Sequence, residues 1–244
     1  MLQHDWYENW FNSPYYKILY QNRNEQEAQA FIEKLILFLQ PPPGSRMLDI
    51  ACGEGRYARQ LAEHDYDVTG IDISQNSIEQ AKASENDHLH FMVQDMRFPF
   101  YINYFNYALN FFTSFGYFIH DRDHMMAARS FTAALKKEGI LVIDYLNREY
   151  VLQHMVQYEN VERGSYHFEI KKKLERNHIV KEISFTDANN KARHYTESVA
   201  AFSLADFNEM FQKAGMQLVS VFGDYKLSEY EPNSSSRMIM IFKK

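Results

Sequence analysis

Apolar residues follow two different spacings along the first 146 positions. In residues 25–40 they recur every three or four positions, which predicts an amphipathic helix that ends at the PPPG of residues 41–44. Beyond this point, short apolar runs alternate with helical patterns, and this alternation indicates a parallel sheet with helices on both faces. The predicted strands cover residues 47–51, 68–73, 90–94, 107–112 and 139–146, and the predicted helices cover residues 57–63, 75–84 and 121–136.

The pattern changes at about Asn147. Strand-like segments at 166–174, 178–186 and 192–202 follow one another with only polar turns between them. Consecutive strands without intervening helices predict a small antiparallel sheet, inserted into the α/β fold. After it, Ser203 and Asp206 have the spacing of a capping box that opens a helix, and two final strands are predicted at 217–222 and 237–242.

These elements predict an α/β protein with a Rossmann-like, doubly wound sheet of seven strands. We expect residues 1–44 to form an N-terminal helical lid, residues 45–146 and 203–244 the core domain, and residues 147–202 the antiparallel β insertion. The first 24 residues are rich in aromatic side chains. Such a segment either closes over a ligand or packs the first helices onto the core, and the two roles are compatible.

Composition narrows the class of protein. The chain has 244 residues, a net charge of −6 and one cysteine. An acidic chain is a poor default partner for nucleic acid, and a single cysteine fits a reducing compartment. The N-terminus lacks the pattern of a secretory signal, and the longest apolar stretch, 107–119, is too short to span a bilayer. We expect a cytoplasmic protein with no membrane segment and no metal site.

The segment MLDIACGEG, at residues 47–55, is a strand that runs into a turn with two glycines. Glycines there permit a tight turn and the close approach of a ligand to the backbone. Gly53, Gly55 and Ala58 also fit the dinucleotide-binding fingerprint, with Asp72 at the distance of a ribose-binding acid. Glu54 argues against a pyrophosphate at this turn, because its charge repels one. A positively charged cofactor without phosphate tolerates such an acid.

Three strand ends carry groups suited to an adenosine cofactor. Asp49 adds a negative charge near the turn, and Asp72 can accept hydrogen bonds from both ribose hydroxyls. Gln94, Asp95 and Met96 follow the third strand. The carboxylate of Asp95 can accept a hydrogen bond from an adenine amino group, and Met96 can pack on the ring.

These motifs resemble those of the class I S-adenosylmethionine (SAM)-dependent methyltransferases. The matching pieces are LDIACGEG at 48–55, GIDIS at 70–74, QDM at 94–96 and LNFFTS at 109–114, in the order and spacing of that family. The resemblance implies SAM as cofactor and a last strand that runs antiparallel to the others. It implies cofactor-binding roles for Asp49, Ala51, Gly53, Gly55, Asp72, Ile73, Gln94, Asp95, Met96 and Asn110.

The stretch YYKILYQNR, at residues 15–23, is similar to the lead-in of small-molecule and amino-sugar N-methyltransferases. In that subgroup a tyrosine and an arginine fold over the cofactor, and the arginine pairs with the methionyl carboxylate. The resemblance assigns Tyr16, Tyr20 and Arg23 to the cofactor, although Arg23 also fits an ordinary exposed residue at a helix start. The same subgroup has a small antiparallel sheet after the fifth strand.

Methyl transfer needs alignment of the nucleophile and exclusion of water more than a catalytic triad. Candidates for the side that faces the methyl group are Tyr117, His120 and Asn147, which follow the fourth and fifth strands. Packing explains Tyr117 as well, and an exposed position explains His120. Arg237 either holds an anionic substrate or belongs to a turn.

We therefore expect a SAM-dependent methyltransferase that acts on the nitrogen or oxygen of a small molecule. Two alternatives stay open: an NAD(P)-dependent oxidoreductase and a SAM-binding protein without catalysis. Nucleic acid is a less favoured partner, and the sequence sets neither the acceptor nor the oligomeric state.

Overall fold

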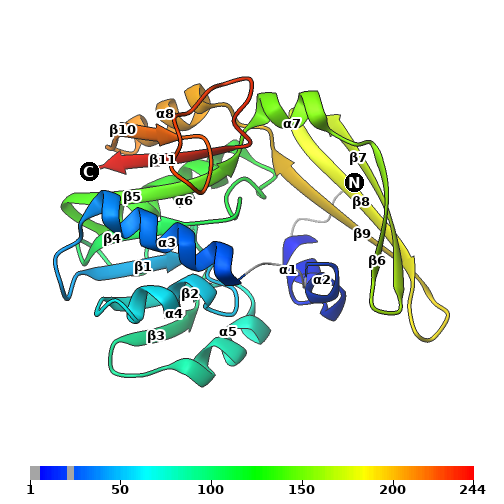
Figure 1. The fold of residues 1–244 in the computed structure, drawn as a ribbon, viewed down its shortest axis with the longest axis horizontal. Coiled ribbons are helices and arrows are strands. Elements are labelled where there is room, and N and C mark those ends of the chain that lie inside the picture. The colour runs from blue at the N-terminus through cyan, green and yellow to red at the C-terminus, as the bar shows by residue number, and fades with distance from the viewer. Residues whose placement is uncertain (1–5, 21–24) are drawn as a thin grey trace.

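The computed structural model describes residues 6–20 and 25–244, which form two β-sheets with helices around the larger one (Figure 1). The larger sheet has seven strands in the order β10-β11-β5-β4-β1-β2-β3. β11 is antiparallel to both of its neighbours, whereas the other pairs are parallel, which confirms the predicted fold class. Its strands are β1 (Arg46–Ile50), β2 (Asp67–Asp72), β3 (Leu89–Val93), β4 (Phe105–Asn110), β5 (Leu135–Leu146), β10 (Gln217–Phe222) and β11 (Arg237–Lys243).

Helices cover both faces of this sheet, as its strands require. Along β1, Met47 packs into one apolar cluster and Leu48 into the other, because successive side chains point to opposite faces. In β5, Val142 and Ile143 divide in the same way. The cluster with Met47 contains residues of α3 (Glu25–Leu39), α4 (Arg56–Ala62) and α5 (Gln75–Ala81). The cluster with Leu48 contains residues of α6 (Asp121–Ala134) and α8 (Leu204–Lys213).

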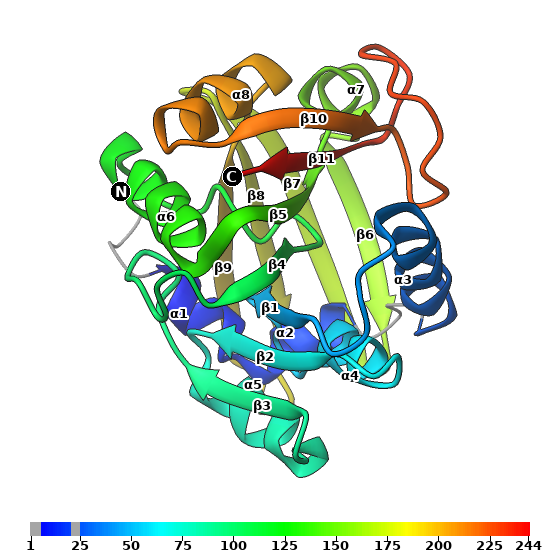
Figure 2. The same ribbon diagram turned by 90° about the vertical axis from the view of Figure 1, so that its left-hand side faces the viewer.

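The smaller sheet stands apart from the larger one, on the right in Figure 1. It is antiparallel, in the order β6-β7-β8-β9. Two short helices lie between the two sheets, α1 (Trp6–Phe11) and α2 (Pro14–Leu19), here called the N-terminal helices. Figure 2 shows the larger sheet in front, with the smaller sheet behind it. The strands of the smaller sheet are β6 (Tyr158–Arg163), β7 (Tyr166–Glu175), β8 (His178–Thr186) and β9 (Ala192–Ala200).

Two elements go beyond the sequence prediction. α7 (Arg148–His154) is a helix of seven residues, and the Asn147 side chain caps it by accepting a hydrogen bond from the Glu149 N–H. The sequence does not predict β6, because Val161 is the only aliphatic residue among its six residues and no apolar alternation marks the strand. The predicted capping box is confirmed: Ser203 and Asp206 exchange hydrogen bonds at the start of α8. In the described part of the chain, no helix has the length and apolar character needed to cross a membrane.

Candidate functional site

The main cavity, of about 420 Å³, lies at the carboxyl ends of the parallel strands. β1 is flanked by β2 on one side and by β4 on the other, so the chain order reverses there. Ligands of doubly wound folds bind at this reversal. The cavity is lined by the turn after β1, by residues after β2, β3 and β4, by the N-terminal helices and by one residue of β9. The cavity therefore has walls from the larger sheet, the N-terminal helices and the smaller sheet.

The turn after β1 brings the backbone to the cavity wall. Ala51 (φ 60°) and Gly53 (φ 57°) both line the cavity in left-handed conformations. A Cβ added at Gly53 would meet nothing within 4 Å, so the space above this glycine is open. Gly55 has a different role: it is buried outside the lining, and a Cβ there would collide with the ring of Phe91. Gly55 thus permits close packing of α4 against the sheet.

Two carboxylates, of the buried Asp49 and the half-buried Asp72, lie beside this turn. Asp72 accepts hydrogen bonds from the backbone N–H groups of Gly53 (2.9 Å) and Ser74 (2.8 Å), which fixes its orientation. Asp49 is 1 % exposed, and its Oδ2 has no hydrogen-bond partner in the described structure. Burial, and then the charge of Asp72, raise the pKa of Asp49 to about 7. Burial also raises the pKa of Asp72. The pair makes this end of the cavity suited to a cation.

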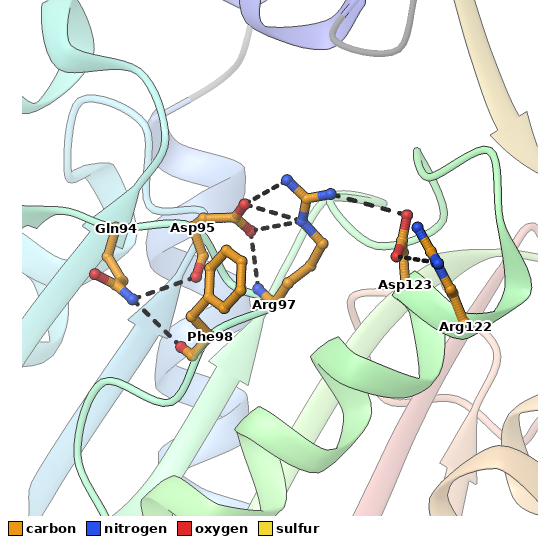
Figure 3. A network of polar contacts seen from close by, with 6 residues as sticks. All are labelled: Gln94, Asp95, Arg97, Phe98, Arg122 and Asp123. Atoms are coloured by element: carbon orange, nitrogen blue, oxygen red, sulfur yellow. Dashed lines mark hydrogen bonds and ion pairs between the residues drawn. The ribbon is translucent and has the colours of Figure 1, made fainter.

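Gln94, Asp95 and Met96 all line the cavity after β3. Figure 3 shows that the Asp95 carboxylate faces Arg97, whose Nε and Nη2 donate to its two oxygens at 2.5–3.1 Å. Arg97 continues to Asp123, 3.8 Å away at the start of α6. This fork occupies most of the acceptor positions of Asp95. The expected bond from Asp95 to an adenine amino group has to use those that remain, and it stays a prediction.

The N-terminal helices close the cavity from the other side. Tyr16 and Tyr20 line it, as the resemblance implies, while Arg23 lies outside the described residues. Lys17 pairs with Glu54 (2.5 Å), so the charge that argued against a pyrophosphate is partly offset by a cation. Asn12 accepts a hydrogen bond from the Ser74 hydroxyl at 2.7 Å. Both contacts join this N-terminal segment to the turns that follow β1 and β2.

Side chains of β5 and β11 hold the turn after β4 in place. Phe112 and Thr113 have φ of 60° and 57°, which is uncommon for residues other than glycine. Asp144, on β5, accepts from the Phe112 N–H at 2.8 Å, and Arg237 forms an ion pair with Asp144 at 2.6 Å. Arg237 also donates to the Thr113 hydroxyl at 2.9 Å. Arg237 therefore braces this turn, and it is not one of the residues that line the cavity.

Of the other candidates from the sequence, one lines the cavity and three do not. Tyr117 lines it, in ring contact with Phe11. His120 is exposed and lies with its neighbours in a shallow depression of its own. Asn147 is buried as the cap of α7, and Asn110 donates to the Ile50 carbonyl at 3.0 Å; neither lines the cavity. Both of these amides join neighbouring segments of the backbone.

Glu197 is a cavity residue that sequence reasoning missed. It lies on β9, where the alternation of half-buried residues gives an acidic side chain no distinguishing signal. Trp10 donates its indole N–H to Glu197 at 2.7 Å, and the Tyr20 hydroxyl donates at 2.7 Å to the same oxygen. Lys181 donates to Tyr20 and lies 3.5 Å from Glu197. Burial raises the pKa of Tyr20 and lowers the pKa of Lys181.

Comparison with known proteins agrees with this geometry. Residues 20–221 match the methyltransferase domain family, and the chain belongs to it. YqeM of Bacillus subtilis, which carries the provisional name of a methyltransferase, is 28% identical over 207 residues, covering 81% of this chain and 83% of its own.

Solved structures share the fold. A SAM-dependent methyltransferase from Clostridium acetobutylicum aligns over 94% of this chain and 95% of its own, with a TM-score of 0.78 and 18% identity. SAM-bound CalS10, an amino pentose methyltransferase from Micromonospora echinaspora, aligns over 95% and 97%, with a TM-score of 0.69 and 15% identity. The fold is that of the class I SAM-dependent methyltransferases, SAM is the cofactor, and the predicted enzyme class is confirmed.

Proposed function

We propose that this protein transfers the methyl group of SAM to a nitrogen or oxygen atom of a small molecule. The observation that carries the proposal is the cavity at the end of β1, enclosed by strand ends, by the N-terminal helices and by β9. Its lining includes Asp49 and Asp72 from the larger sheet, Glu197 from the smaller sheet, and aromatic side chains of the N-terminal helices between the two. A cofactor and an acceptor have separate walls in such a cavity.

The residues at the strand ends fit SAM. The Oδ2 atom of Asp49, buried and without a partner, suits the positively charged methionyl end of the cofactor. The open space above Gly53 lets a ligand approach the backbone. Asp72 would hold the ribose hydroxyls, and Gln94 and Met96 would lie against the adenine. Tyr16 and Tyr20 would cover the cofactor.

Bound SAM supplies an electrophilic methyl group, and the chain's task is to align the acceptor with it. Phe11, Tyr16 and Tyr117 wall the cavity on the side of the N-terminal helices, and these rings exclude water. The acceptor's lone pair then faces the methyl group in a dry site. Alignment of this kind provides the larger part of the rate enhancement of such a displacement.

Two observations favour a small acceptor. The cavity is within the ordinary size of small-molecule sites and is closed over by the N-terminal helices. The chain carries a net charge of −6, which disfavours nucleic acid. CalS10, which shares the fold, is described as an amino pentose methyltransferase, so a small molecule suits this architecture.

The test has two steps. Calorimetric titration with S-adenosylhomocysteine checks the cofactor site, and Asp72→Asn should weaken binding while Asp67→Asn, at the other end of the same strand, should not. Transfer of a labelled methyl group from SAM to a panel of amines and alcohols then checks catalysis. Binding of NADH in place of S-adenosylhomocysteine would contradict the proposal in favour of an oxidoreductase. Tight binding without turnover on any acceptor class would favour a non-catalytic SAM-binding protein.

A further inference from the structure

We propose that Glu197 and the aromatic walls of the cavity form the acceptor site, and that this site takes an amine that arrives as its ammonium ion. The inference rests on the proposed function, because it places the acceptor opposite the cofactor. It adds what the comparisons leave open, namely which atom accepts the methyl group and which side chain selects it.

Glu197 is placed where an acceptor, and not the cofactor, would meet it. Asp49 and Asp72 lie at strand ends of the larger sheet, whereas Glu197 comes from β9 of the smaller one. Figure 1 shows that the N-terminal helices separate these two parts of the molecule. The strand ends and Glu197 line the same cavity. Because Glu197 comes from the smaller sheet, we place it on the wall opposite the strand ends.

The Glu197 carboxylate is held in one orientation and keeps room for a further donor. Its side chain is 15% exposed. Trp10 donates to one oxygen, Tyr20 reaches both oxygens at 2.7 and 2.9 Å, and Lys181 lies 3.5 Å from the second. An ionised carboxylate has about four acceptor positions. Three side chains approach this one, so a position remains for a donor in the cavity that it lines.

Aromatic rings line the same cavity as Glu197, in a series of ring contacts that begins at Tyr20. Tyr16 lies 5.1 Å from Phe11 and 4.9 Å from Tyr20, measured between ring centroids, and Phe11 lies 5.3 Å from Tyr117. All four rings line the cavity. The faces of aromatic rings attract cations, and a carboxylate beyond them adds a charge-assisted hydrogen bond. A protonated amine satisfies both features, whereas a neutral alcohol satisfies only the hydrogen bond.

Lys181 stabilises the arrangement from outside the cavity lining. It is not among the lining residues, and its ammonium donates to the Tyr20 hydroxyl, which donates in turn to Glu197. Lys181 therefore acts as a positioning residue for Tyr20 and Glu197. Its charge compensates that of Glu197 before the acceptor arrives, which allows a carboxylate to be buried at this place.

The transfer balances for such an acceptor. The bound ammonium loses one proton to solvent and becomes a free amine. Its lone pair then forms the bond to the methyl carbon as the bond from that carbon to sulfur breaks, and the bonding pair stays on sulfur. The products are S-adenosylhomocysteine and the methylated ammonium ion.

The inference is tested with two probes of nearly equal shape, cyclohexylammonium and cyclohexanol. Each is titrated by calorimetry into the full chain saturated with S-adenosylhomocysteine, which lacks the sulfonium charge. We expect cyclohexylammonium to bind at least about tenfold more tightly than cyclohexanol. Glu197→Gln should remove this preference. Its own affinity for S-adenosylhomocysteine is measured first, because Glu197 holds Tyr20, and both probes are then titrated at saturation, so a weaker cofactor site does not alter the comparison.

Glu182→Gln is the matched control. Glu182 is a glutamate on the neighbouring strand β8, it pairs with Lys173, and it lies outside the cavity lining. This variant should keep the preference for the ammonium ion. Equal binding of the two probes to the wild-type protein, or an unchanged preference in Glu197→Gln, would overturn the inference. The wild-type comparison needs no variant, so a folding defect in Glu197→Gln leaves the test intact. If S-adenosylhomocysteine itself does not bind, the proposed function fails instead.

Discussion

At the scale of single residues, we predict that Asp49 makes cofactor binding depend on pH. Its pKa of about 7 means that the folded protein binds one proton more than the unfolded chain between about pH 4 and pH 7. By this linkage the buried carboxyl lowers the stability of the ligand-free protein as pH rises through that window. A positively charged ligand reverses the preference, because it binds the ionised form.

We therefore predict that the affinity for SAM rises about tenfold from about pH 6 to about pH 8. Calorimetric titration across this range measures the effect. Asp49→Asn should bind SAM more weakly and with little dependence on pH, whereas Asp65→Asn, at an exposed turn position, should keep the wild-type slope. A flat profile in the wild-type protein would show that Asp49 does not bind the cofactor.

A comparison of Gly53 with Gly44 can distinguish the effect of cofactor contact from the effect of backbone strain. Gly53 (φ 57°) and Gly44 (φ 71°) are both left-handed, and at both a Cβ would meet nothing within 4 Å. Replacement by alanine should cost each protein about 1–2 kcal/mol of folding free energy. Only Gly53→Ala should also weaken binding of S-adenosylhomocysteine, because Gly44 lies outside the cavity. Equal affinities in the two variants would remove Gly53 from the cofactor site.

Sequence reasoning worked best where a residue's role follows from its own backbone. The turn of residues 51–55 and the acid at Asp72 sit at strand ends, and the ends of parallel strands must meet. Glu197 could not be found in this way, because its hydrogen bond with Trp10 joins positions 187 residues apart. Asn110 and Asn147 donate to distant backbone carbonyls and do not line the cavity, and the local sequence indicates neither of these contacts.

At the scale of elements, β11 supports the turn after β4 through Arg237. Asp144 has no exposed surface, so removal of Arg237 leaves a buried carboxylate without its ion-pair partner. We predict that Arg237→Met lowers the free energy of unfolding by about 3–5 kcal/mol. Urea denaturation at neutral pH measures the loss.

A second ion pair on the same strand provides the control. Lys243 pairs with Glu138, and both side chains are exposed. Lys243→Met should cost far less stability than Arg237→Met, because solvent screens an exposed pair. If the two variants lost the same stability, the buried pair would not be what supports the turn.

Periodicity predicted the long elements and missed the short ones. α3 and α6 have 15 and 14 residues, enough turns for an apolar face to repeat. α7 and β6 have seven and six residues, and in β6 alternate residues are half-buried although mostly polar. Such a strand forms because β7 supplies its hydrogen bonds, and this pairing leaves no apolar pattern in the sequence.

At the scale of the whole molecule, the arrangement of the two sheets depends on contacts that no local pattern encodes. General rules for parallel sheets reduce the possible orders of the seven strands to a few. They do not restrict the position of the smaller sheet, because it rests on side chains such as Tyr145, which donates a hydrogen bond across to the Ala200 carbonyl. The division of the chain into lid, core and insertion stays a prediction.

The N-terminal helices bind to both sheets, and this predicts how the molecule responds to ligand. They contact the larger sheet's loops through Asn12 and Lys17, and β9 through Trp10 and Tyr20.

S-adenosylhomocysteine at about 100 times its dissociation constant should stabilise the fold by about 2.7 kcal/mol, which raises the melting temperature by about 5–10 °C. Because the ligand fills a cavity shared by these parts, hydrogen exchange should slow in α1, α2 and β9 together with the turn after β1. Exchange in α8, whose residues do not line the cavity, should slow much less. Protection confined to the strand ends of the larger sheet would show that the N-terminal helices do not close over the ligand.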